Sequence, residues 1–146
     1  MTQRTEARFK VFSESDDTVF STFKYDNIDF NVGGTYDTTT YEYTVDNSGT
    51  YLIGYSFVKK NPYNNNDYYG GSIVLLTRGD TTYTICRTKF YENASNTTIS
   101  NLFMYKFEVG DKLIIIADGG QPKMNRYNNY SNHILNSWWG IKLNYN

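Results

Sequence analysis

The sequence predicts an all-β protein, a sandwich or jelly roll of about ten short strands. Aromatic residues make up 18% of the chain, with 15 Tyr and 9 Phe, and chains rich in aromatic residues and Thr favour pleated, half-buried surfaces. Apolar and polar residues alternate with a period of two in several short segments, which is the pattern of a half-buried strand. No segment has the spacing of an amphipathic helix, and turn residues separate the strands at regular intervals.

The clearest strands lie between residues 30 and 58. Residues 41–45 alternate apolar and polar side chains, and residues 51–57 place Tyr, Ile, Tyr and Phe on one face of a longer strand. The intervening residues 46–49, Asp-Asn-Ser-Gly, predict a turn because Asn and Gly tolerate positive φ. Before these strands, Gly33 and Gly34 allow the backbone to bend where a side chain would clash.

The other strands follow in order along the chain. We expect strands at residues 9–12, one or two within 19–31 with a turn near Asp26 and Asn27, and then at 72–78, 82–89, 98–107, 112–118 and 137–143. Residues 73–76 and 113–116 are apolar on both faces, which predicts strands that are covered on both sides. The sequence shows no repeat or linker, so we expect one domain over residues 1–146, with a core at about 9–143.

These residues resemble the globular domain of the C1q/TNF-like superfamily. The resemblance rests on an aromatic residue, a Gly bend, a Tyr-Asp pair, an aromatic-Thr strand end and alternating aromatic positions, here Phe30, Gly33-Gly34, Tyr36-Asp37, Tyr43-Thr44, Gly49, Tyr51, Ile53 and Tyr55. It continues in Gly110-Asp111 before a hydrophobic strand and in Trp138-Trp139-Gly140-Ile141. The sequence departs from the family in lacking a proline before the turn Gly, in its Asn- and Tyr-rich loops, and in showing no collagen-like run. The resemblance implies a jelly roll that assembles as a homotrimer.

The trimer prediction has modest support in the residues themselves, because surplus apolar faces of a sandwich need a partner. We assign Leu113, Ile115 and Trp138 to the subunit interface. Trp138 and Trp139 are neighbours on one strand and point to opposite faces. One of them should therefore enter the core, while the other faces outward or meets a neighbouring subunit.

The composition argues against an enzyme. His133 is the sole His, which excludes the two-His motifs of zinc hydrolases, and Cys86 is the sole Cys, which excludes an intrachain disulfide. The adjacent carboxylates of Asp16 and Asp17 allow two interpretations, a cation site or a solvated turn. The solvated turn is the commoner outcome for such a pair. We therefore predict no catalytic residue, no metal ligand and no cofactor. Some members of the superfamily hold calcium near the trimer axis, so calcium is possible by resemblance, but no residue here can be assigned to it.

Two long loops are the candidate ligand-binding segments. They combine Tyr rings with Asn, Asp and Arg, a composition that gives low-entropy contacts and adaptable hydrogen bonds and that also suits sugars. The alternative interpretation is compositional, since Asn and Tyr are abundant throughout this chain. The candidate residues are Tyr63, Asp67, Tyr68 and Tyr69 in the first loop and Asn125, Arg126, Tyr127 and Tyr130 in the second.

The sequence thus predicts a non-enzymatic, lectin-like trimeric recognition domain that binds a cell-surface or microbial ligand, glycan or protein receptor, by avidity. The alternative is a structural, trimerising head of a fibre or stalk without a specific small ligand. A net charge of -1 gives no field that recruits nucleic acid, and no apolar run predicts membrane insertion. Residues 1–12 lack the apolar core of a signal peptide. The resemblance alone implies a secreted, cell-adhesion or virion-surface setting.

Overall fold

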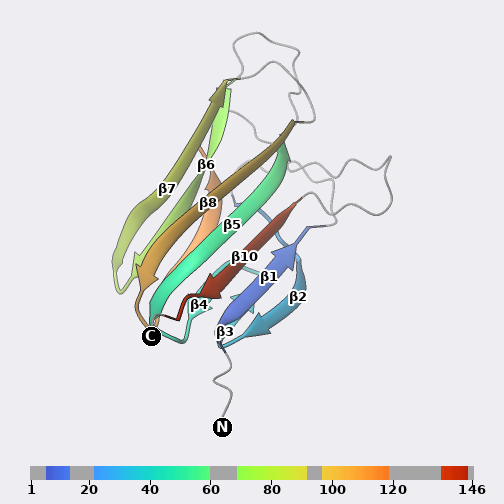
Figure 1. Cartoon of the computed structure of the whole chain (residues 1–146). Helices are drawn as coiled ribbons and strands as arrows, with labels where there is room; N and C mark the ends of the chain where they lie inside the picture. Colours follow the sequence, from blue (N-terminus) through green and yellow to red (C-terminus); the bar gives the residue numbers. More distant parts are fainter. Residues whose placement is uncertain (1–5, 14–21, 60–68, 92–96, 119–135, 145–146) are drawn as a thin grey trace.

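The computed structural model describes residues 6–13, 22–59, 69–91, 97–118 and 136–144. Within these residues, ten strands form two five-stranded sheets packed face to face (Figure 1). The strands are β1 (Arg8–Phe12), β2 (Asn27–Val32), β3 (Gly34–Asp37), β4 (Glu42–Val45), β5 (Gly49–Lys59), β6 (Tyr69–Arg78), β7 (Thr81–Tyr91), β8 (Thr97–Phe107), β9 (Lys112–Ala117) and β10 (Ser137–Lys142). The predicted all-β sandwich of about ten strands is confirmed.

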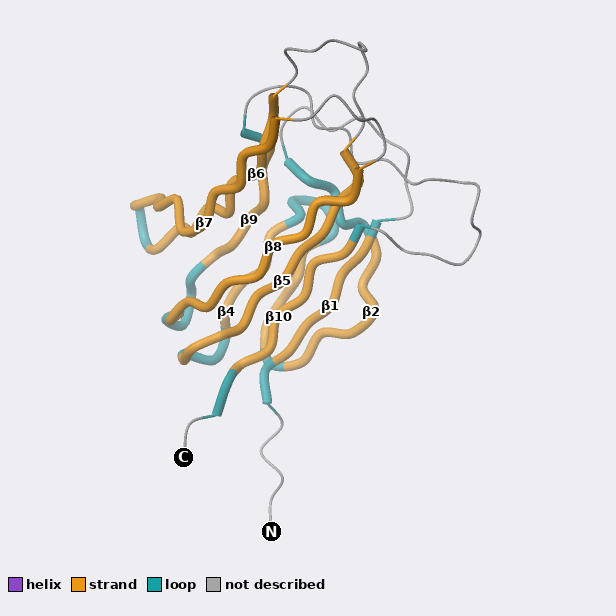
Figure 2. The backbone as a smooth tube through the Cα atoms, turned by 45° about the horizontal axis from the view of Figure 1, so that its top comes forward, coloured by secondary structure: helices purple, strands orange, loops and turns teal. Residues whose placement is uncertain are grey.

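All neighbouring strands in both sheets are antiparallel. Sheet A has the strand order β2-β1-β10-β5-β8, and sheet B has the order β3-β4-β9-β6-β7. Figure 2 shows the two layers side by side, with the strands of each sheet running along the sandwich. The edge strands β7 and β8 contact each other on one side of the sandwich, and β2 contacts β3 on the other.

The predicted turn at residues 46–49 joins two sheets rather than two paired strands. β4 pairs with β3 and β9 in sheet B, whereas β5 pairs with β10 and β8 in sheet A. The bend at Gly33, where φ is 69°, likewise carries the chain from sheet A to sheet B. Residues that carry a side chain rarely adopt this positive φ, which explains why a glycine occupies this position. Asn27, expected in a turn, begins β2 instead.

The core is built from aromatic side chains around the fully buried Trp138. The Phe9 and Tyr36 rings approach the Trp138 indole edge to face, with centroids 5.2 and 5.8 Å away. Tyr43 stacks on Phe9 at 3.9 Å. Edge-to-face packing suits the aromatic quadrupole, and each such pair adds about 1 kcal/mol beyond the area it buries. These contacts join the inner faces of both sheets.

A buried ion pair fastens the turn between β8 and β9 to the end of β6. Asp111 is buried, and the Arg78 guanidinium donates to both of its carboxylate oxygens, at 2.8 and 2.6 Å. The backbone N–H of Glu108 donates to the same carboxylate at 2.8 Å. Burial by itself would raise the pKa of Asp111, but these hydrogen bonds and the Arg78 charge outweigh it and hold the pKa below its usual value. The turn is thereby held against the β6–β7 hairpin.

At the other end of the sandwich, several strand ends lie together. Lys59, the last residue of β5, pairs with Thr97, the first of β8, and Tyr69 at the start of β6 pairs with Tyr91 at the end of β7. β9 ends and β10 begins at this same end, because Ala117 pairs with Ser72 and Ser137 with Ser56. We call this end, where β5, β7 and β9 finish, the loop end.

Candidate binding face

The outer surface of sheet A, which we call face A, is the candidate site among the described residues. The strand register aligns side chains of all five strands in rows across this face, and alternation along each strand directs them away from the core. One row contains Phe30, Lys10, Trp139, Gly54 and Leu102, and the next contains Arg8, Ile141, Leu52 and Met104. A third row, nearer the loop end, contains Ser137, Ser56 and Ser100.

Face A is unusually apolar for a surface. Leu102 and Met104 on the edge strand β8 are each 60% exposed, and Phe30 on the opposite edge strand is 41% exposed. Between them, the side chains of Leu52, Trp139 and Ile141 are half-buried. Contiguous apolar side chains on one face of a soluble sandwich are typical of an interaction surface, whereas scattered ones are not.

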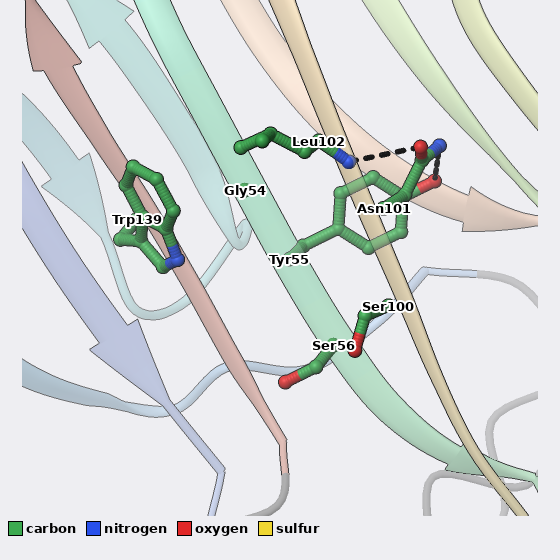
Figure 3. A pocket seen from close by; sticks show the side chains of 7 residues that line it. All are labelled: Gly54, Tyr55, Ser56, Ser100, Asn101, Leu102 and Trp139. Carbon is green, nitrogen blue, oxygen red and sulfur yellow. Dashed lines mark hydrogen bonds between the residues drawn. The ribbon is translucent and has the colours of Figure 1, made fainter.

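A hollow of about 370 Å³ lies on this face beside Gly54. Trp139 and Leu102 line it on either side, with Ser56 and Ser100 on the side of the loop end (Figure 3). The Trp139 indole lies over Gly54, since a Cβ built there would lie 2.4 Å from Cζ2 of the ring. The walls are therefore apolar on two sides and carry hydroxyl groups on a third.

A polar cluster behind the hollow links the two sheets. The side-chain amide of Asn101 on β8 donates to the Tyr55 hydroxyl at 3.2 Å, to the Cys86 sulfur at 2.9 Å and to the Thr88 hydroxyl at 2.6 Å. The Tyr55 hydroxyl also bonds the buried Ser72 hydroxyl at 2.6 Å. Because Asn101 and Tyr55 also border the hollow (Figure 3), this cluster holds its floor in place.

Charge is distributed unevenly around face A. Lys10 pairs with Asp29 at 3.4 Å, and the Arg8 guanidinium lies over the Phe30 ring, 5.9 Å from its centroid. Lys106, which follows Met104 in the outward-facing positions of β8, is exposed. Arg8 and Lys106 are therefore the exposed cations of face A, and the charge of Lys10 is balanced by Asp29.

The loop residues predicted to bind ligand lie, with the exception of Tyr69, outside the described residues. Tyr63, Asp67, Tyr68, Asn125, Arg126, Tyr127 and Tyr130 lie outside the described residues, and of Tyr69 only the backbone is described, as the first residue of β6. The strands that flank both predicted loops can be placed. β5 and β9 end at the loop end, where β6 and β10 begin, so both loops are anchored at one end of the sandwich.

The residues predicted for the subunit interface are placed in the core instead. Leu113 and Trp138 have no exposed surface and Ile115 is 1% exposed, so these side chains have no surface to present to another copy. The assignment of Leu113, Ile115 and Trp138 to an interface is therefore corrected. The expectation that one of the two adjacent Trp residues enters the core holds, and Trp139 is the one on the surface.

Strands β6 and β9 were predicted to be covered on both sides. Their core side is buried, whereas their outer side is only partly covered. Val74, Leu76, Leu113 and Ile115 face the core and are buried. On the outer face of sheet B, Ile73 is 8% exposed, while Leu75, Ile114 and Ile116 are half-buried.

The described residues were compared with the predictions for metal ligands and for Cys86 and His133. Within them, no group of three or more His, Cys, Asp or Glu side chains is arranged to hold a metal ion. Cys86 is half-buried against the core, and His133 lies outside the described part of the chain. Among the same residues, no helix is long and apolar enough to cross a membrane.

Comparison with solved structures identifies the fold. The chain is similar to Eiger TNF from S. frugiperda, with a TM-score of 0.72 at 12% identity, over 97% of this chain and 94% of that one. It is also similar to murine APRIL, with TM-scores of 0.70 at pH 5.0 and 0.67 at pH 8.5, both at 12% identity over 95% of this chain and 100% of that one. The chain therefore folds as a TNF/C1q-like jelly roll, as the resemblance predicted. No protein-family model matches it, and no curated protein matches it in sequence.

Leu102 and Met104 were not among the predicted site residues, although their sequence positions carry a signal. Both lie in a predicted strand, and alternation along that strand places them together on one of its two faces. Knowing which face was the core required the pairing of β10 with β5 and of β5 with β8. Gly54, over which the Trp139 indole lies, carried no signal of its own.

Proposed function

We propose that this protein is a non-enzymatic, homotrimeric recognition domain that binds a cell-surface or microbial ligand, a glycan or a protein receptor, through segments at its loop end. The observation that carries the proposal is the exposed apolar face A on a TNF/C1q-like jelly roll. We assign Leu102 and Met104, each 60% exposed, to the subunit interface. They replace the three buried residues that were first assigned to it.

Face A supports assembly on physical grounds. The inner faces of the two sheets already bury one aromatic core, so the apolar rows of face A are surplus to the single chain. Burying a Leu or Met side chain stabilises an assembly by roughly 1.5–3 kcal/mol when the side chain starts fully exposed. Several such side chains on one contiguous face favour a stable contact between copies.

Recognition at the loop end is supported by the positions where the predicted loops are anchored. The two predicted binding loops, residues 59–71 and 119–132, lie between strands that end or begin there. A trimer with parallel subunits would present three copies of these segments together, and threefold presentation converts weak sites into strong avidity. The Tyr- and Asn-rich composition of the segments suits either ligand class.

The absence of enzyme activity, the extracellular or virion-surface setting and the possible axial calcium belong to the same proposal. The single His and single Cys support a non-enzymatic role. The likeness to TNF-type folds supports the setting. Calcium is included as a variable of the binding experiment because no ligand residues can be named.

The first test is the mass in solution, by sedimentation equilibrium at micromolar concentration. One chain is 17.0 kDa, so the proposal requires about three times that mass. A monomer at these concentrations would refute the trimer.

The second test is a glycan array with labelled trimer, run once with calcium and once with EDTA. Hits on one sugar class that weaken in Tyr63→Ala, Tyr68→Ala or Tyr127→Ala support a lectin, and loss in EDTA adds a metal. A blank array from a trimer excludes the glycan and leaves a protein receptor or a structural fibre head.

A further inference from the structure

The outer surface of sheet B, which we call face B, is a second candidate interaction surface. It lies on the opposite side of the sandwich from face A (Figure 2), so both faces can be occupied at once and face B does not depend on the proposed trimer. The outward-facing side chains at its centre come from β6 and β9 and are Ile73, Leu75, Ile114 and Ile116. The residues that alternate with them face the core.

The centre of face B is a contiguous aliphatic surface. Ile73 pairs with Ile116 and Leu75 pairs with Ile114, so the four side chains form two adjacent rows. Ile73 is 8% exposed, and the other three are half-buried. An antiparallel sheet that faces water usually has polar side chains on that face, whereas contiguous apolar side chains are typical of an interaction surface.

Polar side chains surround this centre. On one side, the Thr77 and Thr82 hydroxyls are hydrogen-bonded to each other at 3.1 Å, and Lys112 continues the same row on β9. On the side of the loop end, Arg87 and Lys89 lie in outward-facing positions of β7. An apolar centre inside a polar rim is the anatomy of a protein–protein interface. The four central side chains provide no aromatic ring for a sugar to stack on, so face B suits a protein better than a glycan.

The rim of face B presents positive charge outward. Arg87 Nε lies 3.0 Å from a carboxylate oxygen of Asp118, and Lys112 Nζ lies 3.5 Å from one of Glu42. In both ion pairs the cation is the more exposed side chain, at 51% against 19% and at 51% against 30%. Lys89 adds a further exposed cation. Such a rim attracts carboxylates and disfavours the approach of a second face B, because like charges would then meet.

The strand register sets the spacing that a partner has to match. Arg87 pairs with Ile73 on β6 and Lys112 pairs with Thr77, four residues further along the same strand. Four residues of a strand span about 13 Å. A matching partner therefore has two carboxylates about 13 Å apart with apolar side chains between them, which corresponds to about nine residues of a helix or four of a strand.

We propose that face B is a docking surface for an acidic, amphipathic segment of another protein. Apolar side chains of the partner cover the aliphatic centre, while its carboxylates bind Arg87 on one side and Lys112 on the other. Face B is thus a recognition surface separate from the loop end.

Hydroxyl-radical footprinting of the full chain shows first whether face B is free. Leu75 and Ile114 should be oxidised in the dilute protein alone, because their side chains are half-buried rather than buried. Val74 and Leu113 are the matched controls, since they neighbour these residues but are buried in the core and should stay unmodified. Protection of Leu75 and Ile114 in the dilute chain would mean that the chain covers face B itself, which overturns the proposal.

Selection of peptides then tests the chemistry of the partner. A random 12-residue peptide library displayed on phage is selected on the wild-type chain and depleted on the variant Leu75→Ser/Ile114→Ser. The enriched peptides should combine apolar residues with Asp or Glu and should bind the wild type roughly tenfold or more tightly than this variant. Their affinity should fall with added salt. Enrichment of basic or uncharged sequences, or no enrichment after depletion, overturns the proposal.

Two further variants separate a lost contact from a damaged fold. Lys112→Gln alters only an exposed side chain, and it should weaken binding of the selected peptides and reduce the dependence of their affinity on salt. Ile28→Ser is the matched control, because Ile28 is 45% exposed at the edge of sheet A and away from face B, and it should leave binding unchanged. Circular dichroism shows whether each variant keeps the fold. Insensitivity to Lys112→Gln would contradict the proposed role of the cations.

Other occupants of face B give different results. Growth of the mass with concentration that is lost in Leu75→Ser/Ile114→Ser would indicate a second copy, and sedimentation with phosphatidylserine vesicles that is lost in the same variant would indicate a lipid surface. Either result overturns the protein partner. A wild-type monomer or a blank glycan array bears on the proposed function and leaves face B standing, whereas failure of the peptide selection leaves the trimer and the loop end standing.

Discussion

Replacing the two most exposed apolar residues of face A should dissolve the proposed assembly without unfolding the chain. In the variant Leu102→Ser/Met104→Ser, both side chains lie on the outer face of the edge strand β8 and are 60% exposed in the single chain. Neither belongs to the aromatic core. The thermal midpoint measured under monomeric conditions should therefore change little.

The magnitude follows from the exposed fraction. Full burial of a Leu or Met is worth roughly 1.5–3 kcal/mol, so burying the exposed 60% is worth about 1–2 kcal/mol for each side chain. The two together contribute about 3 kcal/mol per copy and about 9 kcal/mol per trimer. That is about six powers of ten in the dissociation constant of the trimer. Since the half-assembly concentration varies as the square root of this constant, it should rise about a thousandfold, or about thirtyfold if the contact buries only half of this surface.

Sedimentation velocity over a concentration series measures this shift. Val109→Ser is the matched control, because Val109 is 67% exposed in the β8–β9 turn and away from face A. If the wild type is a trimer and the double variant assembles at the same concentration, face A lies outside the contact and its assignment to the interface is refuted.

Three further predictions concern the single chain. Asp111→Asn should lower the free energy of unfolding by about 2 kcal/mol at neutral pH. Because folding lowers the pKa of Asp111, its contribution is complete above the ordinary carboxyl pKa near 4 and is lost as the pH falls through the folded-state value. Urea titrations should therefore show the difference from wild type shrinking below about pH 4, and a pH-independent difference would contradict this. Gly34→Ala should cost about 1–3 kcal/mol in the same assay, because its Cβ would lie within 2.5 Å of Cζ of the buried Tyr43 ring; a neutral effect would mean that the ring can move. Asn101→Ala should destabilise the chain by about 1–2 kcal/mol and speed the reaction of Cys86 with a thiol reagent, whereas an unchanged rate would show that the amide does not shield the sulfur.

The strands themselves could be predicted because their signals are local. In residues 51–57 every second side chain is large and apolar or aromatic, and the structure places Tyr51, Ile53, Tyr55 and Phe57 in the core with exposures of 0–2%. Gly33 was expected to bend the chain and has a φ of 69°. Alternation and turn chemistry depend only on neighbours in sequence, so no knowledge of the partner strand was needed.

The connection between β4 and β5 shows where local signals stop. A short polar turn between two alternating strands is also the pattern of a hairpin, yet here the chain leaves sheet B at Val45 and enters sheet A at Gly49. Pairing partners distant in sequence decide this, since β4 pairs with β9 and β5 with β8 and β10. Nothing within residues 42–59 encodes those partners.

The candidate site was harder to predict than the strands, because an apolar residue on a strand can face either the core or the surface. Leu113 and Ile115 looked like interface residues because their strand is apolar on both faces, but their own side chains are in the core. Met104 and Leu102 alternate with Phe103 and Tyr105, and every one of the four is apolar or aromatic. Register resolves the ambiguity, since Ile53 pairs with Phe103 and Gly54 with Leu102. A one-residue shift in that register would exchange the core for the surface, so the identity of face A is a property of strand pairing, and the experiment that tests face A tests the register at the same time.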